Sequence, residues 1–100
     1  MSTRITVMYD VPQHPDAFEV AYDTQMELAA ALPSLQRVET HRVWPPGPES
    51  RHLAYRVVEL YFKDPEALRH AMGTTQATSL FPSIFELGAC GVHLVYHAGS

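Results

Sequence analysis

The order of strand-like and helix-like apolar patterns constrains the fold of this chain most strongly. Four segments alternate apolar and polar residues, as half-buried strands do, and two carry the i, i+3, i+4 spacing of an amphipathic helix. Pro33 ends the first helical pattern, and Asp64-Pro65 supplies an N-cap and a first-turn proline for the second. The predicted strands span residues 5–9, 35–44, 53–62 and 90–96, and the predicted helices span residues 16–32 and 65–73.

This βαββαβ order predicts a ferredoxin-like α+β fold. Two right-handed crossovers place both helices on one face of a four-stranded antiparallel sheet. The length of 100 residues fits a single domain spanning residues 1–100. Between the second helix and the last strand, residues 74–85 are expected to form a short helical turn and a loop that is broken at Pro82.

Gln25 interrupts the apolar stripe of the first helix. It lies one turn from Tyr22 and from Leu28, where a leucine would be expected. A buried amide without partners costs about 1–3 kcal/mol. Either a hydrogen-bond partner lies across the core, or this helix face lines a cavity that holds water or a ligand.

The third strand indicates what covers the second face of the sheet. Its even positions suit packing beneath the helices, with Arg56 as a misfit. Its odd positions carry one carboxylate, Glu59, among aromatic and aliphatic residues, where a solvated face would be polar. Such a patch marks an interface or a ligand site. We expect a second copy of the sheet to cover it, forming a homodimer with a cavity between the sheets. The odd positions are Leu53, Tyr55, Val57, Glu59 and Tyr61.

Composition excludes several classes of function. The net charge of −4 argues against a nucleic-acid partner, and no apolar run approaches the roughly 18–20 residues of a membrane span. The only cysteine, Cys90, cannot form an intrachain disulfide. Because no signal segment precedes the first strand, we expect a cytoplasmic protein.

No cofactor or metal is expected. The chain has no glycine-rich phosphate loop and no dinucleotide motif. His93 and His97 have the spacing of a helical metal pair, but on a strand they would stand roughly 13 Å apart. The sequence therefore predicts no metal ligands.

Several features follow one another along the chain: the first strand ending in Tyr9, Pro15-Asp16-Ala17-Phe18, Leu28-Ala29, Leu32-Pro33-Ser34-Leu35, Val58-Glu59-Leu60-Tyr61-Phe62, Asp64-Pro65-Glu66-Ala67-Leu68 and Phe85. With these features in this order, the chain resembles the EthD family of dimeric α+β barrel proteins. One departure is that Gln25 and Glu27 stand in the first helix where the family often has a His-x-Pro-Leu-Ala context, so an amide replaces a histidine that could transfer protons. The resemblance implies a small apolar, often aromatic ligand, because such proteins are linked to ether degradation and relatives act as cyclases, isomerases, decarboxylases or cofactor-free monooxygenases. It does not fix a reaction.

Glu59 and His41 are the predicted catalytic residues. A partly desolvated carboxylate among aromatic residues is a good proton acceptor. The more common alternative for such a pattern is a structural carboxylate bonded to a neighbouring Tyr, Arg or His. Histidine side chains exchange protons near neutral pH. The predicted ligand-binding residues are Gln25, Tyr9, Tyr22, Tyr55, Tyr61 and Trp44, although aromatic residues at these spacings also form ordinary cores.

Three functions follow from these expectations. The first is a cofactor-independent lyase, isomerase or cyclase that uses Glu59 as a base, with Gln25 and a tyrosine or His41 orienting a carbonyl group. The second is a binding or accessory protein of a degradation or biosynthetic pathway. The third is a dimer whose interface is filled by side chains and leaves no cavity.

Overall fold

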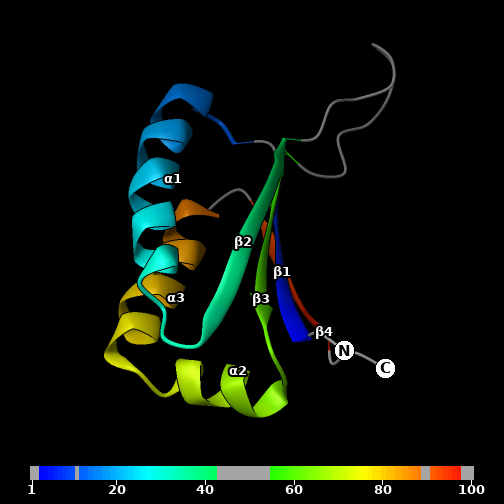
Figure 1. Cartoon of the computed structure of the whole chain (residues 1–100). Coiled ribbons are helices and arrows are strands. Elements are labelled where there is room, and N and C mark those ends of the chain that lie inside the picture. Colours follow the sequence, from blue (N-terminus) through cyan, green and yellow to red (C-terminus); the bar gives the residue numbers. More distant parts are fainter. Residues whose placement is uncertain (1–2, 11, 43–54, 89–90, 98–100) are drawn as a thin grey trace.

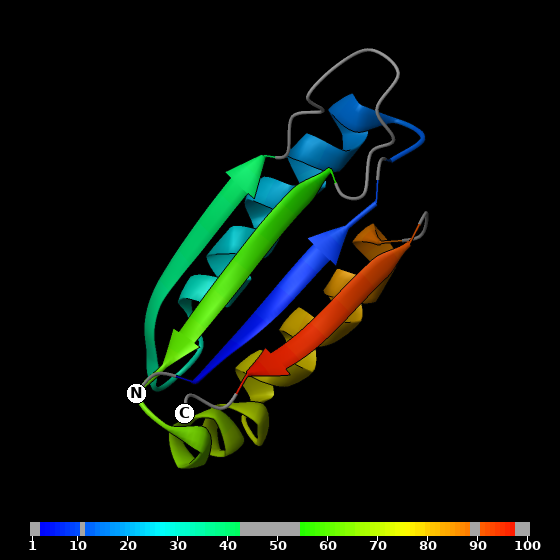
Figure 2. The ribbon, with the colours of Figure 1, turned by 90° about the vertical axis from the view of Figure 1, so that its right-hand side faces the viewer.

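A computed structural model of the chain describes residues 3–10, 12–42, 55–88 and 91–97. The elements are β1 (Thr3–Tyr9), α1 (Pro15–Ala30), β2 (Leu35–Arg42), β3 (Arg56–Phe62), α2 (Pro65–Met72), α3 (Thr75–Leu87) and β4 (Val92–His97). The strands form one sheet of order β2-β3-β1-β4, in which all pairings are antiparallel. The helices lie on one side of this sheet (Figure 1), and the other side carries no helix of the described chain (Figure 2). The predicted ferredoxin-like α+β fold is therefore confirmed.

The helix-facing side of the sheet forms the core. In β1 and β3, alternate residues face α1 and α3, and the cross-strand pairs Ile5–Leu60 and Val7–Val58 are at most 3% exposed. The predicted inward direction of the even positions of β3 is confirmed for Val58, Leu60 and Phe62.

Arg56, the misfit of the third strand, also lies on the helix-facing side. Its Nη2 donates to Glu19 Oε1 of α1 at 2.5 Å, and its guanidinium lies 4.1 Å from the centre of the Tyr22 ring. The strand register continues without a bulge between β1 and β3. The charge is thus tolerated at this inward position because α1 supplies both a carboxylate and an aromatic face.

The prediction of a short turn and a loop for residues 74–85 is wrong. This region is a continuous helix, α3, which spans 13 residues and includes Pro82. The Thr74 hydroxyl caps its first turn by accepting from the Ala77 backbone N–H at 3.3 Å. Its buried residues, Ala77, Leu80 and Ile84, form one apolar face. Packing of this face outweighs the hydrogen bond that a proline removes from a helix interior.

Tyr55 also departs from the sequence interpretation. We expected it on the uncovered side of the sheet, but its ring packs edge-on against Phe18 with centroids 5.2 Å apart, and it is 7% exposed. Since β3 begins only at Arg56, the strand alternation does not extend to Tyr55. Trp44, Leu53, Ala54 and Cys90 lie outside the described residues. None of the described helices is long and apolar enough to cross a membrane.

Candidate functional site

A pocket of about 580 Å³ lies between α1, α3 and the segment that leads into α1. Phe18 and Gln25 line it and are themselves buried, whereas Ala17, Ala21 and Thr24 line it and are exposed. The pocket therefore connects the protein surface with the core. Its lining residues are Pro12, Gln13, His14, Ala17, Phe18, Ala21, Thr24, Gln25, Leu28, Ser83, Glu86 and Leu87.

The buried stripe of α1 places Gln25 where the pocket meets the sheet. Phe18, Tyr22, Gln25 and Ala29 are the buried residues of this helix. Phe18 anchors the stripe, with its ring 5.3 Å from that of Tyr9 in an edge-on arrangement and 6.1 Å from that of Tyr22 in a stacked one. Gln25 follows two turns later and is held at the same depth.

Tyr9 and Gln25 form a buried polar pair. The Tyr9 hydroxyl donates to Gln25 Oε1 at 2.6 Å, and the two residues are 1% and 2% exposed. Gln25 Nε2 has no partner among the described residues. Both interpretations of Gln25 thus hold in part, since one end of its amide has a partner across the core and the residue also lines a pocket.

Burial raises the pKa of the Tyr9 phenol well above its usual range, and the hydrogen bond to Gln25 offsets only part of this. The ionised form would place a charge in the core, where none of the described residues supplies a compensating cation. Tyr9 is therefore a protonated donor at neutral pH.

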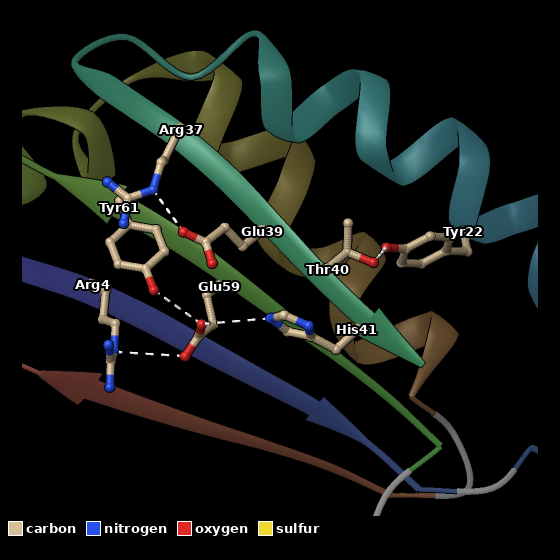
Figure 3. A network of polar contacts seen from close by, with 8 residues as sticks. All are labelled: Arg4, Tyr22, Arg37, Glu39, Thr40, His41, Glu59 and Tyr61. Atoms are coloured by element: carbon tan, nitrogen blue, oxygen red, sulfur yellow. Dashed lines mark hydrogen bonds and ion pairs between the residues drawn. The ribbon is translucent and has the colours of Figure 1, made fainter. Parts of the chain in front are cut away.

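A second polar cluster lies on the uncovered side of the sheet (Figure 3). Glu59 Oε2 accepts from the Tyr61 hydroxyl at 3.0 Å, and Glu59 Oε1 lies 3.6 Å from Arg4 Nε. His41 Nε2 is 4.0 Å from Glu59 Oε2. The Glu59 side chain is only 18% exposed, although no helix covers it.

Glu39 and Glu59 are directly opposite each other on β2 and β3, which would be repulsive in isolation. Arg37 Nε donates to Glu39 at 2.7 Å, and its guanidinium lies 3.8 Å from the centre of the Tyr61 ring. Ligand atoms of Glu39, His41 and Glu59 come within 4.8 Å of one another. A cation could bind there only by competing with Arg4 and Arg37, which already compensate the two carboxylates.

The first predicted function needs Gln25 and Glu59 at one active site, and we expected them to line one cavity within each protomer. This expectation is wrong, because the two residues do not share a cavity within one protomer. Gln25 bonds to Tyr9 on the helix side, whereas Glu59 interacts with Arg4 and Tyr61 on the other side. The sheet separates them because successive strand residues point to opposite faces.

The predicted site residues therefore fall into separate regions. Of those that the structure describes, Gln25 lines the pocket. Tyr9, Tyr22 and Tyr55 lie in the core, and Tyr61 and His41 lie with Glu59. Sequence reasoning missed His14, Ser83 and Glu86 as lining residues. The last two were obscured because Pro82 suggested a loop instead of a helix facing α1.

No family model matches the sequence, and no curated protein matches it. The structure is similar to that of an EthD family protein from Bacillus halodurans, with 22% identity, complete coverage of both chains and a TM-score of 0.89. It is also similar to a dimeric ferredoxin-like protein from Thermobifida fusca, with 16% identity over 99% of this chain and 92% of that chain and a TM-score of 0.72. A third similar structure is that of SnoaB, a cofactor-independent oxygenase from Streptomyces nogalater. The identity is 16% over 99% of this chain and 91% of that chain, and the TM-score is 0.65.

These similarities define the chain as a ferredoxin-like α+β protein whose fold matches an EthD family structure over its full length. The expected resemblance to the EthD family is confirmed at the level of the fold.

Proposed function

We propose that this protein binds a small, mainly apolar molecule in the pocket between α1 and α3. The observation that carries the proposal is the pocket itself, whose volume of about 580 Å³ lies in the usual range of ligand sites. Apolar side chains such as Phe18, Leu28 and Leu87 line it together with a few polar groups. That combination suits an apolar ligand which is oriented by one or two hydrogen bonds.

The structural neighbours support a small-molecule function. They include a cofactor-independent oxygenase and an antibiotic biosynthesis monooxygenase, as well as the EthD family protein. Because one fold hosts many activities, they favour ligand binding without specifying a reaction for this chain. We expect no cofactor.

We further propose that the protein is a homodimer in which two copies of the uncovered sheet face pack together. This face presents Val57, Tyr61 and Val95 among its charged residues, and several neighbours of the same fold are described as dimeric. The Thr6 hydroxyl is buried without a hydrogen-bond partner among the described residues, and the buried Arg4 Nε makes no hydrogen bond there, only the ion pair with Glu59. A partner copy would cover the apolar residues and bring additional polar groups to this face.

The pocket proposal is tested with N-phenyl-1-naphthylamine, a neutral apolar dye whose fluorescence increases in an apolar site. Ala21 and Ala30 are both exposed residues of α1, but only Ala21 lines the pocket. We expect Ala21→Trp to weaken dye binding at least about tenfold, because the indole fills the pocket, and Ala30→Trp to leave binding unchanged. Equal effects of the two variants, or no binding to the wild type, would reject the proposal.

A second candidate function is acid–base catalysis at Glu59. The observation that favours it is a half-buried carboxylate within 4.0 Å of His41 and hydrogen-bonded to Tyr61. Because the sheet separates Glu59 from the pocket, its substrate would lie between the two sheets of a dimer. Glu59→Gln should then reduce turnover by roughly 10²–10⁴-fold, while Ala21→Trp should not. The opposite result would place the chemistry in the pocket.

A further inference from the structure

We propose that the pocket selects ligands whose apolar body carries a neutral hydrogen-bond acceptor, such as a ketone, aldehyde or ester oxygen, and that the amide of Gln25 recognises this oxygen. The inference rests on the proposed function and names the chemical class of its ligand.

The unpaired end of the Gln25 amide carries the argument. Gln25 is 2% exposed and lines the pocket, and its Nε2 has no hydrogen-bond partner among the described residues. A buried donor without an acceptor is costly, so a ligand that brings an acceptor gains the bond and relieves that cost. A pure hydrocarbon in the same place would leave the donor unpaired.

Tyr9 fixes which end of the amide remains available. Its hydroxyl donates to Gln25 Oε1 at 2.6 Å, which leaves the two hydrogens of Nε2 free. If the amide were turned over, Nε2 could donate to the Tyr9 oxygen, but the Tyr9 proton and the Gln25 carbonyl would then both lack a partner in the core. The burial that keeps Tyr9 protonated also keeps it a donor. The available end of Gln25 is therefore a donor and selects acceptors.

The charges around the pocket favour a neutral ligand over an anion. None of the described lining residues is a lysine or an arginine, and Glu86 is among them. A carboxylate ligand would have to be desolvated near Phe18 and Leu28, and the only described lining side chain that can carry a positive charge, His14, is exposed in the segment before α1. A carbonyl oxygen accepts the same hydrogen bond at a much smaller desolvation cost.

Three naphthalene derivatives of similar size test this selection by calorimetry. They are 2-acetylnaphthalene, which carries a ketone, 2-ethylnaphthalene, which lacks the acceptor, and 2-naphthoate, which carries an anionic one. We expect the wild-type protein to bind the ketone about threefold to tenfold more tightly than the hydrocarbon, as one hydrogen bond allows, and also more tightly than the anion. Gln25→Leu should abolish the preference for the ketone while retaining binding of 2-ethylnaphthalene.

Thr24→Val is the matched control, because Thr24 is a polar lining residue whose exposed side chain is not part of the buried pair. It should keep the preference for the ketone. Equal wild-type affinities for ketone and hydrocarbon, both blocked by Ala21→Trp, would overturn this inference and leave the proposed pocket standing. A preference that survives in Gln25→Leu would also overturn it. Failure of all three compounds to bind would reject the pocket and the inference together.

Discussion

The two faces of the sheet use polar groups in opposite ways. On the helix side, the neutral pair of Tyr9 and Gln25 lies in the apolar core and is almost inaccessible to solvent, while the ion pair of Arg56 and Glu19 is only partly buried. On the uncovered side, Glu59 lies among Arg4, His41 and Tyr61, and its charge is shared among several groups. The helix side thus holds an amide with one unpaired end next to a pocket. The uncovered side holds a carboxylate whose charge is balanced by neighbouring cationic and hydrogen-bonding groups.

This difference shows that an unpaired polar group costs more at a buried position than at an exposed one. In the core, an unpaired donor is expensive, and for this reason we proposed that a ligand bonds to the free end of the Gln25 amide. On the uncovered face, water and opposite charges compensate most defects, and individual ion pairs contribute little to stability. The same sheet can therefore support a binding site on one side and an association surface on the other.

The largest contrast is expected from two adjacent valines of β3. Val58 faces the core and is 3% exposed, whereas Val57 faces the uncovered side and is partly exposed. Val58→Ala should lower the free energy of unfolding by about 2–3 kcal/mol, because it removes buried methyl groups and leaves a cavity. At protein concentrations low enough for the monomer to predominate, Val57→Ala should cost less than about 1 kcal/mol. Urea denaturation of both variants measures the difference, and equal losses would contradict the assignment of the faces.

Removal of the Tyr9 hydroxyl should have the next largest effect. In Tyr9→Phe, both ends of the buried Gln25 amide lack a protein partner, so the free energy of unfolding should fall by about 1–2 kcal/mol. Tyr22→Phe is the control, since the Tyr22 hydroxyl donates to Thr40 in a partly exposed contact and its loss should cost less. A neutral effect of Tyr9→Phe would show that the pair does not stabilise the core.

The contribution of Tyr9 should also depend on pH. In the folded protein, burial raises the pKa of Tyr9. In the unfolded protein, the same tyrosine has a pKa of about 10. Above that value the unfolded state releases a proton that the folded state retains, so stability falls as the pH rises. The stability difference between wild type and Tyr9→Phe should be constant below about pH 9 and should narrow above about pH 10. A constant difference through this range would contradict the buried, protonated phenol.

Two adjacent residues of β4 test the association surface. Val95 pairs with Thr6 on the uncovered face, whereas Tyr96 pairs with Ile5 and points to the helix side. Both are exposed in the single chain, at 39% and 54%. Val95→Lys should raise the dimer dissociation constant at least about tenfold by burying a charge, and Tyr96→Lys should not. Sedimentation velocity measures both, and a monomeric wild type would remove the proposed interface.

The smallest effect is expected from Arg37→Ala. Arg37 is an exposed residue that pairs with Glu39 and lies over the Tyr61 ring. Because exposed ion pairs are screened by water and salt, the midpoint of urea denaturation should not change measurably. A clear loss of stability in the monomer would show that the charge network is a structural element in its own right.

Local patterns predicted most of the fold. The stripe of α1, the inward direction of Val58, Leu60 and Phe62, and the N-cap at Asp64 all agree with the structure. Asp64 accepts from the Ala67 backbone N–H at 2.8 Å, as its position before Pro65 suggested. These features depend on residues that are close in sequence, so periodicity and capping rules suffice.

The errors arise where tertiary packing overrides a local signal. Pro82 penalises a helix locally, but Leu80 and Ile84 gain more by packing in the core than the proline costs. Tyr55 precedes its strand and turns toward Phe18, a choice that strand alternation does not encode. Both errors concealed part of the environment of α1.

The sequence by itself determined that Gln25 would be buried and that Glu59 would lie on the opposite side of its strand from the core, because periods of 3.6 and 2 residues fix these directions. Only the tertiary structure decided that Tyr9 meets Gln25 across 16 positions of sequence and that α3 faces α1 around a pocket. Contacts between distant segments depend on how whole helices and strands pack. No local pattern records which end of an amide is left without a partner.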